Sequence, residues 1–433
     1  MGSKSSSEAE TLDRLVPWIA AIAFQFTLTL GLSGTAIRVS LADILVPLGL
    51  LAMLSAVRRR YGLRAGFSRA TPGWSLIIWA VLTTAWLTFS LLNGRNEIGG
   101  WSGWALQNKY IGWYALLVFL FSGFAFERVF SGFATRFLTA FIVVAWVISL
   151  ATILAFAVAL WAQFPKVFLL GPDFRAVGML VNPNAFGFTI AIAVLLHLSG
   201  RVPLPSAKWM RVSGLVLLLA VLVLAGSRSA WMACVVALVT MTVLQRWDWR
   251  QLIMAVPVTA ALLAIFLSTF PEQSVVVEGA EPNRVYVARD VVATLNHVSV
   301  SHRVEQLEGA FALWKSAPLR GAGLGVYLDR ERDLGRGIPQ QIHNSYLWLL
   351  AETGLVGTVL FGGLFLTLLA KSWRRRESDD LMTIGVPVLL MVAVFAVFQE
   401  ALYQRHTWFF AGILFARLML VRGQPDAPGS QAG

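Results

Sequence analysis

The chain has 433 residues, of which 57% are hydrophobic and only 13% are charged. Because soluble domains carry roughly 25% charged residues, this composition excludes an ordinary soluble protein and indicates an integral membrane protein. The net charge of +12 comes mostly from short loops between apolar segments. It therefore indicates contact with anionic lipid head groups and not with nucleic acid.

About twelve apolar segments recur along the chain, each long enough to cross a hydrocarbon core about 30 Å thick. They span residues 15–32, 39–57, 74–92, 108–126, 137–162, 184–200, 211–226, 229–246, 252–270, 344–370, 381–398 and 404–421. A polar stretch precedes the first segment and no convincing cleavage site follows it, so we expect a retained helix and not a signal peptide. The pattern predicts an all-α polytopic membrane protein, with residues 1–433 forming a single transmembrane domain.

Lys and Arg gather in one set of short loops and at the termini, about twenty residues against about seven in the short loops of the opposite side. This asymmetry places both termini in the cytoplasm and the long loop at 271–343 outside. A loop of this length is seldom a passive connector. We expect short helices within it, one over 290–296 and an amphipathic one over 301–315, that cap the outer face. The apolar face of the second is predicted to consist of Val304, Leu307, Phe311 and Trp314.

Arg228 lies in a tight Gly226-Ser227-Arg228-Ser229 turn between two apolar segments, which places it at the exterior interface. The ordinary interpretation is an arginine whose side chain reaches from a hairpin turn to the interface. Against it, ionisable groups at membrane depth usually serve a function. The guanidinium group also offers a fork of donors that suits phosphate oxygens.

Arg303 begins the amphipathic helix of the long loop, opposite its apolar face or at the edge of that face. A solvated arginine at a helix start is an equally good interpretation of this spacing. Arg320 precedes the glycines Gly321, Gly323 and Gly325. This stretch lacks the Lys-Ser/Thr ending of a nucleotide-binding loop, so the glycines predict a tight backbone turn and not a phosphate cradle.

His343 ends the long loop and directly precedes a long apolar helix. A lone histidine in a loop is usually only polar surface, but a helix N-terminus keeps an imidazole neutral and able to accept a proton. The same helix end favours a nearby anion. Asn344 either orients the imidazole or caps the helix. Glu352 lies about 13 Å further along the helix, within the membrane, where it could pair with an arginine.

No histidine pair has the i, i+4 spacing of a helical metal site. The carboxylates of Asp329, Glu331 and Asp333 alternate with Arg330 and Arg332, which is typical of a self-neutralised, solvated charge run. The sequence therefore predicts no metal and no cofactor.

Several short motifs, in their order along the chain, resemble the O-antigen ligase and polymerase superfamily. The resemblance covers about residues 180–365 by motif and the whole chain by helix count. It rests on Asn182-Pro183-Asn184, on Gly226 to Trp231, on Ser301-His302-Arg303 with Leu307 and Trp314, on Pro318 to Gly325, and on His343-Asn344 followed by Gly354 and Gly357. The spacing from His343-Asn344 to Gly354 and Gly357 is the ligase-type pattern.

The resemblance implies a metal-independent, inverting membrane glycosyltransferase with a C-type fold. Such a ligase transfers O-antigen polysaccharide from undecaprenyl diphosphate to lipid A–core, forming complete lipopolysaccharide on the periplasmic face of the Gram-negative inner membrane. The family's essential histidine corresponds to His343, which would be the general base. Its arginines correspond to Arg228 and Arg303, which would bind the diphosphate with help from Arg175 and Arg320. Supporting roles would fall to Asn184, Asn344 and Glu352.

Three alternatives stay open at this point. An O-antigen polymerase uses the same donor but a growing glycan as acceptor, and a protein O-oligosaccharyltransferase uses a Ser or Thr side chain. A transporter with the long loop as a lid belongs to a different class. The sequence shows no paired halves and no midplane breaks of the kind common in transporters, and its candidate residues gather at the exterior interface.

Overall fold

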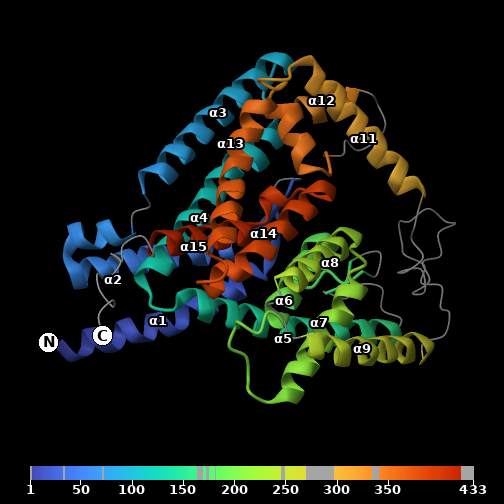
Figure 1. Cartoon of the computed structure of the whole chain (residues 1–433). Coiled ribbons are helices and arrows are strands. Elements are labelled where there is room, and N and C mark those ends of the chain that lie inside the picture. The colour runs from blue at the N-terminus through green and yellow to red at the C-terminus, as the bar shows by residue number, and fades with distance from the viewer. Residues whose placement is uncertain are drawn as a thin grey trace, which may run out of the picture.

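Figure 1 shows the computed structural model, which describes residues 2–32, 35–70, 73–162, 169–171, 175–180, 182–244, 249–269, 297–333 and 341–420. Helices dominate these residues. The helices that precede the long loop are α1 (Gly2–Phe24), α2 (Ala42–Ala70), α3 (Trp74–Ile98), α4 (Gly112–Val129), α5 (Phe133–Ala162), α6 (Pro183–Leu198), α7 (Lys208–Leu224), α8 (Arg228–Val243) and α9 (Trp249–Thr269). A π-helical turn, η1 (Ala105–Ile111), leads into α4.

The long loop contributes α11 (His297–Ser316) and α12 (Val326–Asp333), and the chain ends in α13 (Ser345–Arg375), α14 (Asp380–Phe398), the short η2 (Ala401–Tyr403) and α15 (Arg405–Leu420). Helix α11 confirms the helix predicted over 301–315. The charge run at 329–333 belongs to α12, where Arg332 lies 3.8 Å from Asp329 one turn away. The helix predicted over 290–296 and most of the loop before it lie outside the described residues.

Every apolar segment of the sequence overlaps a helix, and the protein is an α-helical membrane protein. Five helices of the described residues are long and apolar enough to cross a membrane: Trp74–Ile98, Ala105–Val129, Phe133–Ala159, Ser345–Arg375 and Asp380–Phe398. Others, such as Pro183–Leu198 and Arg228–Val243, are apolar but shorter. A total of twelve spans, and the side of the membrane on which each loop lies, stay predictions.

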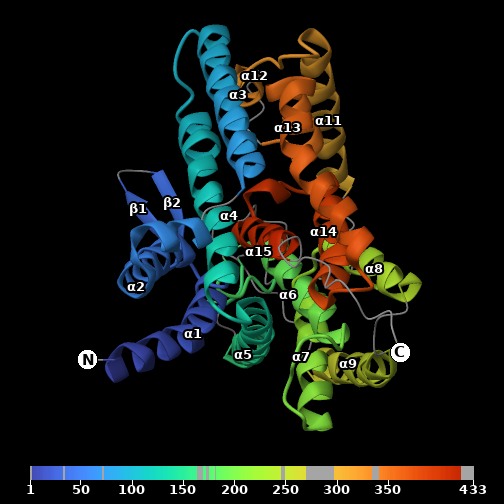
Figure 2. The ribbon, with the colours of Figure 1, turned by 60° about the vertical axis from the view of Figure 1, so that its left-hand side comes forward.

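The first apolar segment, 15–32, was wrongly predicted as one helix. Helix α1 ends at Phe24, and the chain continues into an antiparallel hairpin of β1 (Thr27–Leu32) and β2 (Thr35–Ser40). Threonine and leucine alternate at the start of β1, and this period of two is that of a strand. The hairpin lies against α2 (Figure 2), and its first residue bonds to the carbonyl of Met179 at 2.8 Å.

Helices α4 and α15 pack closely at the centre of the molecule (Figure 2). A Cβ atom on Gly123 would overlap the carbonyl of Phe409, and one on Gly412 would overlap that of Leu120. Glycines at such crossings let helix backbones approach each other within a membrane. The buried indole of Trp408 meets the rings of Trp79, Trp113, Phe361 and Phe365 beside this crossing. This aromatic core fixes α15 and therefore the chain that leads into it from η2.

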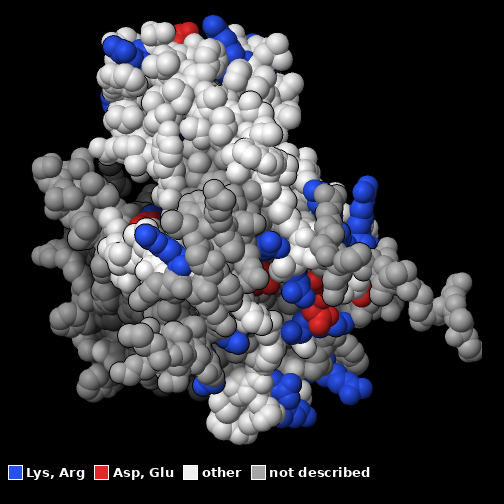
Figure 3. All heavy atoms as spheres, turned by 90° about the vertical axis from the view of Figure 1, so that its left-hand side faces the viewer, with Lys and Arg blue, Asp and Glu red and all other residues white. Residues whose placement is uncertain are grey.

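The described surface in Figure 3 carries a broad band of uncharged side chains. Charged side chains gather above this band, at the upper end of the molecule, and again in its lower part. Helix α3 carries exposed apolar residues, such as Trp74, Ile78, Val81 and Leu82. An uncharged band between two charged ends is what a membrane-embedded surface requires.

Helix α13 is interrupted at Gly354, whose backbone has φ 69° and ψ −173°, so the helix consists of two limbs, 345–353 and 355–375. The glycine loop 321–325 fits into this break. Ala322 donates to the carbonyl of Ala351 at 2.9 Å, and Gly323 donates to that of Glu352 at 3.0 Å. On its other side, Leu324 donates to the carbonyl of Ser90 at 2.9 Å. The glycines therefore form a tight backbone turn, as predicted, and the structure shows that this turn joins α3 to the break in α13.

Candidate active site

Arg228 is the first residue of α8 and is exposed. Ser227 caps the helix by accepting a hydrogen bond from the backbone N–H of Ala230 at 3.4 Å. Gly226 has a positive φ of 57°, which a residue with a side chain rarely adopts, and this turn reverses the chain between α7 and α8. The turn predicted from the sequence thus presents Arg228 at a helix N-terminus, where backbone N–H groups also favour an anion.

Arg175 stabilises the turn at Gly226 through hydrogen bonds. Its guanidinium donates to the carbonyls of Ala225 at 2.9 Å and Gly226 at 3.1 Å, and to the side-chain oxygen of Asn184 at 3.2 Å. Asn184 lies in the first turn of α6, which Asn182 caps. The structure therefore gives Arg175 and Asn184 a positioning role for the turn that carries Arg228. Direct contact of Arg175 with a diphosphate stays a prediction.

Arg303 lies on the buried face of α11, so of the two placements expected from the sequence, opposite the apolar face or at its edge, the first was wrong. Among the residues of this helix whose side chains the structure describes, Gln306, Ala310 and Leu313 are buried and recur with Arg303 at helical spacing, whereas Val304 and Phe311 are exposed. The predicted apolar face was therefore rotated away from the true one. Arg303 itself is half-buried. Burial lowers the pKa of its guanidinium first, and the positive charge of Arg228 lowers the pKa further.

His343 is half-buried just before α13, and Asn344 caps that helix by accepting from the backbone N–H of Leu347 at 2.9 Å. The cap is the interpretation of Asn344 that the structure supports. The pKa of His343 is lowered, first by burial and then by the positive charge of Arg303, while the negative charge of Glu400 acts to raise it. The imidazole is therefore held in its neutral form, which can accept a proton.

Three of the predicted site residues thus form one electrostatic neighbourhood. The charge of Arg228 acts on Arg303, and the charge of Arg303 acts on His343. They come from three segments, at the starts of α8 and α11 and just before α13. Among the described residues, neither arginine forms an ion pair with a carboxylate. Arginines without an acidic partner offer the donors that an anion with several oxygens accepts, and the binding of such an anion by this pair stays a prediction.

Lys109 and Glu400 complete the neighbourhood, and sequence reasoning missed the lysine. Lys109 on η1 is 1% exposed, and its ammonium donates to a carboxylate oxygen of Glu400 at 2.6 Å. The ammonium also lies 4.3 to 4.6 Å from the ring centroids of Trp104, Trp348 and Tyr403. This aromatic cage fixes Glu400, the carboxylate that acts on His343. The signal was a lysine inside an apolar helix, which is seldom without a function.

Glu352 is fully buried behind this cage. It accepts a hydrogen bond from the indole N–H of Trp348 at 2.8 Å and from the backbone N–H groups of Gly325 and Tyr327. The cation that interacts with it is Lys109, so the arginine partner expected from the sequence was wrong. Glu352 ties the glycine loop to α13, and its supporting role in the reaction stays a prediction.

Arg320 lies away from the neighbourhood. It is exposed and follows the C-terminal end of α11, while Arg303 lies near the start of that helix. Residues 303 and 316 alone are separated by about 20 Å along the axis. The structure therefore does not bring Arg320 to Arg303, and help from Arg320 in binding a diphosphate stays a prediction.

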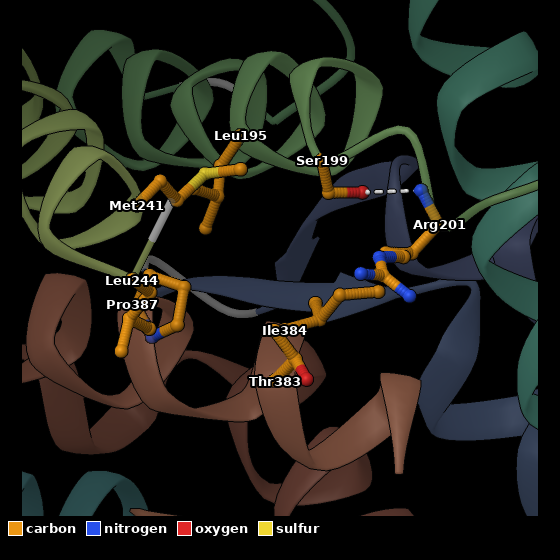
Figure 4. A pocket seen from close by; sticks show the side chains of 8 residues that line it. All are labelled: Leu195, Ser199, Arg201, Met241, Leu244, Thr383, Ile384 and Pro387. Carbon is orange, nitrogen blue, oxygen red and sulfur yellow. Dashed lines mark hydrogen bonds between the residues drawn. The ribbon is translucent and has the colours of Figure 1, made fainter. Parts of the chain in front are cut away.

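A small cavity of about 250 Å³ lies at the opposite ends of the same helices (Figure 4). It is lined by Leu195 and Ser199 of α6 and its end, by Met241 of α8, and by Thr383 and Ile384 of α14. The Asn184 end of α6, the Arg228 end of α8 and the Phe398 end of α14 are the ends that face the candidate site. The cavity in Figure 4 is therefore separate from it.

No group of three or more His, Cys, Asp or Glu side chains gathers to hold a metal ion within the part of the chain that the structure describes. The absence of a metal from the reaction stays a prediction. The chemistry that the described residues offer is that of a neutral imidazole beside two unpaired guanidinium groups.

Residues 213–362 match the family described as O-Antigen ligase. No curated protein matches the chain. The matched region contains the turn with Arg228, the helix with Arg303, the glycine loop and His343, which are the segments that form the site described above. Over residues 213–362 the chain is therefore similar to the O-antigen ligase family, as the order of the short motifs in the sequence also indicates.

Proposed function

We propose that the protein is an O-antigen ligase, which transfers O-antigen polysaccharide from undecaprenyl diphosphate to lipid A–core on the periplasmic face of a Gram-negative inner membrane. The observation that carries the proposal is the neighbourhood of Arg228, Arg303 and His343 within the matched family region. It offers an anion site and a proton acceptor side by side, and a glycosyl transfer from a diphosphate needs these two groups.

The reaction is a displacement at the anomeric carbon of the first sugar of the donor. The hydroxyl oxygen of the acceptor forms a bond to this carbon as the bond to the diphosphate oxygen breaks, and the configuration inverts. The electron pair of the broken bond leaves with the diphosphate. Arg228 and Arg303 stabilise the charge that develops there through charge-assisted hydrogen bonds. His343 takes the proton of the attacking hydroxyl.

The test is transfer by purified protein in lipid nanodiscs, with undecaprenyl-diphosphate-linked O-antigen, lipid A–core and a metal chelator. We expect His343→Ala to lower the transfer rate by about 10²–10⁴-fold, which is the usual contribution of a general base. Arg228→Lys and Arg303→Lys should also be impaired, because lysine lacks the two-pronged geometry of the guanidinium. Arg332→Lys on α12 is the matched control, since its side chain is 71% exposed. Full activity of His343→Ala would refute the assignment of the base.

The polymerase is the main alternative, because the same family region supports both activities. The two differ in the acceptor and not in the anion site. In the same nanodiscs, a growing lipid-linked glycan replaces lipid A–core as the acceptor. Extension of that glycan, with no product on lipid A–core, would identify a polymerase, and transfer to a Ser or Thr peptide would identify a protein glycosyltransferase.

A further inference from the structure

A large apolar cavity begins beside the candidate site. It has about 1080 Å³ of unfilled space, part of which is open to the surface. Its walls come from both limbs of α13, from α14 and from the start of η2. Ser345, two residues after His343, and Ala401, one residue after Glu400, line the end nearest the site. One end of the cavity is therefore formed by residues that lie within two positions of His343 and Glu400 in the chain.

The lining contains no charged residue, and its hydroxyl groups already donate within the protein. Ser345 donates to the carbonyl of Gln399 at 2.8 Å, Tyr346 to that of Ala393 at 2.9 Å and Thr358 to that of Gly354 at 2.8 Å. Because these hydroxyl protons already form hydrogen bonds within the protein, they need no hydrogen-bond acceptor on a ligand. The remaining lining is aliphatic and aromatic, so the cavity suits a hydrocarbon.

The lining residues indicate a space that extends along one helix and is open at its side. The cavity follows the second limb of α13 from Thr358 to Leu369, a distance of about 16 Å along the helix. Val359 and Leu366 on its edge are 62% and 68% exposed, so it opens laterally. Gly362 and Gly363 form part of the wall, and a Cβ atom on either would meet nothing within 4 Å. These two glycines leave the space that a hydrocarbon chain would occupy.

We propose that this cavity binds the polyprenyl chain of the donor, next to its diphosphate. The inference rests on the proposed function, which supplies a donor with one long hydrocarbon chain joined to a diphosphate. One end of this apolar space is lined by Ser345 and Ala401, which lie within two residues of His343 and Glu400 in the chain. An acceptor built on lipid A carries several acyl chains side by side and needs a broader surface.

The test measures the binding of undecaprenyl diphosphate without sugar to purified protein in nanodiscs. Gly362→Leu adds a side chain to the cavity wall at a position where the Cβ atom would meet nothing within 4 Å. We expect it to weaken binding by at least about tenfold, because a buried leucine side chain replaces apolar ligand contacts worth that much. The control is Ala370→Leu, which adds similar bulk to an exposed position of the same helix outside the cavity. Geranyl diphosphate, whose chain is short, should bind the native protein and Gly362→Leu with similar affinity.

Unchanged affinity of Gly362→Leu for undecaprenyl diphosphate would overturn the proposal. Equal competition by an ordinary membrane phospholipid, or by lipid A–core, would also overturn it and would assign the cavity to acyl chains. The readout does not depend on catalysis. A protein that binds undecaprenyl diphosphate with the expected chain-length dependence but transfers no sugar would contradict the proposed function and support the cavity assignment.

Discussion

Replacing Lys109 by methionine tests the buried ion pair beside His343. Methionine keeps the length and the apolar stem of the side chain but removes the ammonium that lies 2.6 Å from Glu400. Breaking a buried pair by removing one partner costs about 3–5 kcal/mol, because the other charge is left without compensation. The side chain of Glu400 is 17% exposed. Water can therefore compensate part of its charge, and we expect the lower end of the range, about 3 kcal/mol.

The double variant Lys109→Met, Glu400→Gln distinguishes the contribution of the ion pair to stability from that of side-chain packing. With both charges removed, no buried ion is left uncompensated, and a neutral pair of similar volume is often nearly as stable as the ion pair. We therefore expect the double variant to recover about 2 kcal/mol relative to Lys109→Met alone. This recovery and the loss in Glu400→Gln together give the coupling energy of a double-mutant cycle.

The assay is thermal unfolding of the purified variants in one detergent, with Arg332→Met as the control. The ion pair of Arg332 with Asp329 is 3.8 Å long and exposed, so its loss should cost less than about 1 kcal/mol. A midpoint of Lys109→Met equal to that of the native protein would refute the reasoning. A double variant whose loss is the sum of the two single losses would show that Lys109 and Glu400 do not depend on each other.

Three further predictions follow from single contacts. If His343 is the base, activity is present above its pKa and lost as the pH falls through it; Glu400→Gln removes the charge that raises this pKa, so the acid limb of kcat/KM should move to lower pH. Gly354→Ala should cost at least about 1–3 kcal/mol in thermal stability, because the residue has φ 69° and its Cβ would overlap the carbonyl of Leu319. Arg175→Ala removes three hydrogen bonds that hold the turn of Arg228. It should raise the KM for the donor, and a KM equal to the native value would show that the turn needs no such support.

Hydropathy was enough to predict the helices, because a long apolar run in a membrane protein has few other structures available to it. The segment 15–32 was the exception, since its hydrophobicity is high throughout while its period changes to that of a strand within the hairpin. The orientation of α11 was also wrong. Its exposed residues Val304 and Phe311 are as apolar as the buried Ala310 and Leu313, so hydrophobicity could not distinguish the face that meets protein.

The residues of the candidate site could be identified by type, but their proximity could not be predicted. Arg228, Arg303 and His343 are brought together by the packing of α8 on α14 and of α11 on α13, and no local pattern records these contacts. The pair of Lys109 and Glu400 joins residues that are 291 positions apart. A lysine in an apolar helix predicts that an acidic partner exists, but only the fold shows which residue it is.

The charges around His343 imply that binding of the donor makes the imidazole of His343 a stronger base. In the protein alone, the positive charge of Arg303 lowers the pKa of His343, which makes the imidazole a weaker base. A diphosphate bound between Arg228 and Arg303 would offset this positive charge, so the pKa of His343 should rise when the donor is bound. The acid limb of kcat/KM reports the enzyme before it binds substrate, and that of kcat reports the complex. For the proposed ligase, the limb of kcat should therefore lie at higher pH than that of kcat/KM. If both limbs coincide, the diphosphate does not bind where Arg303 acts on His343.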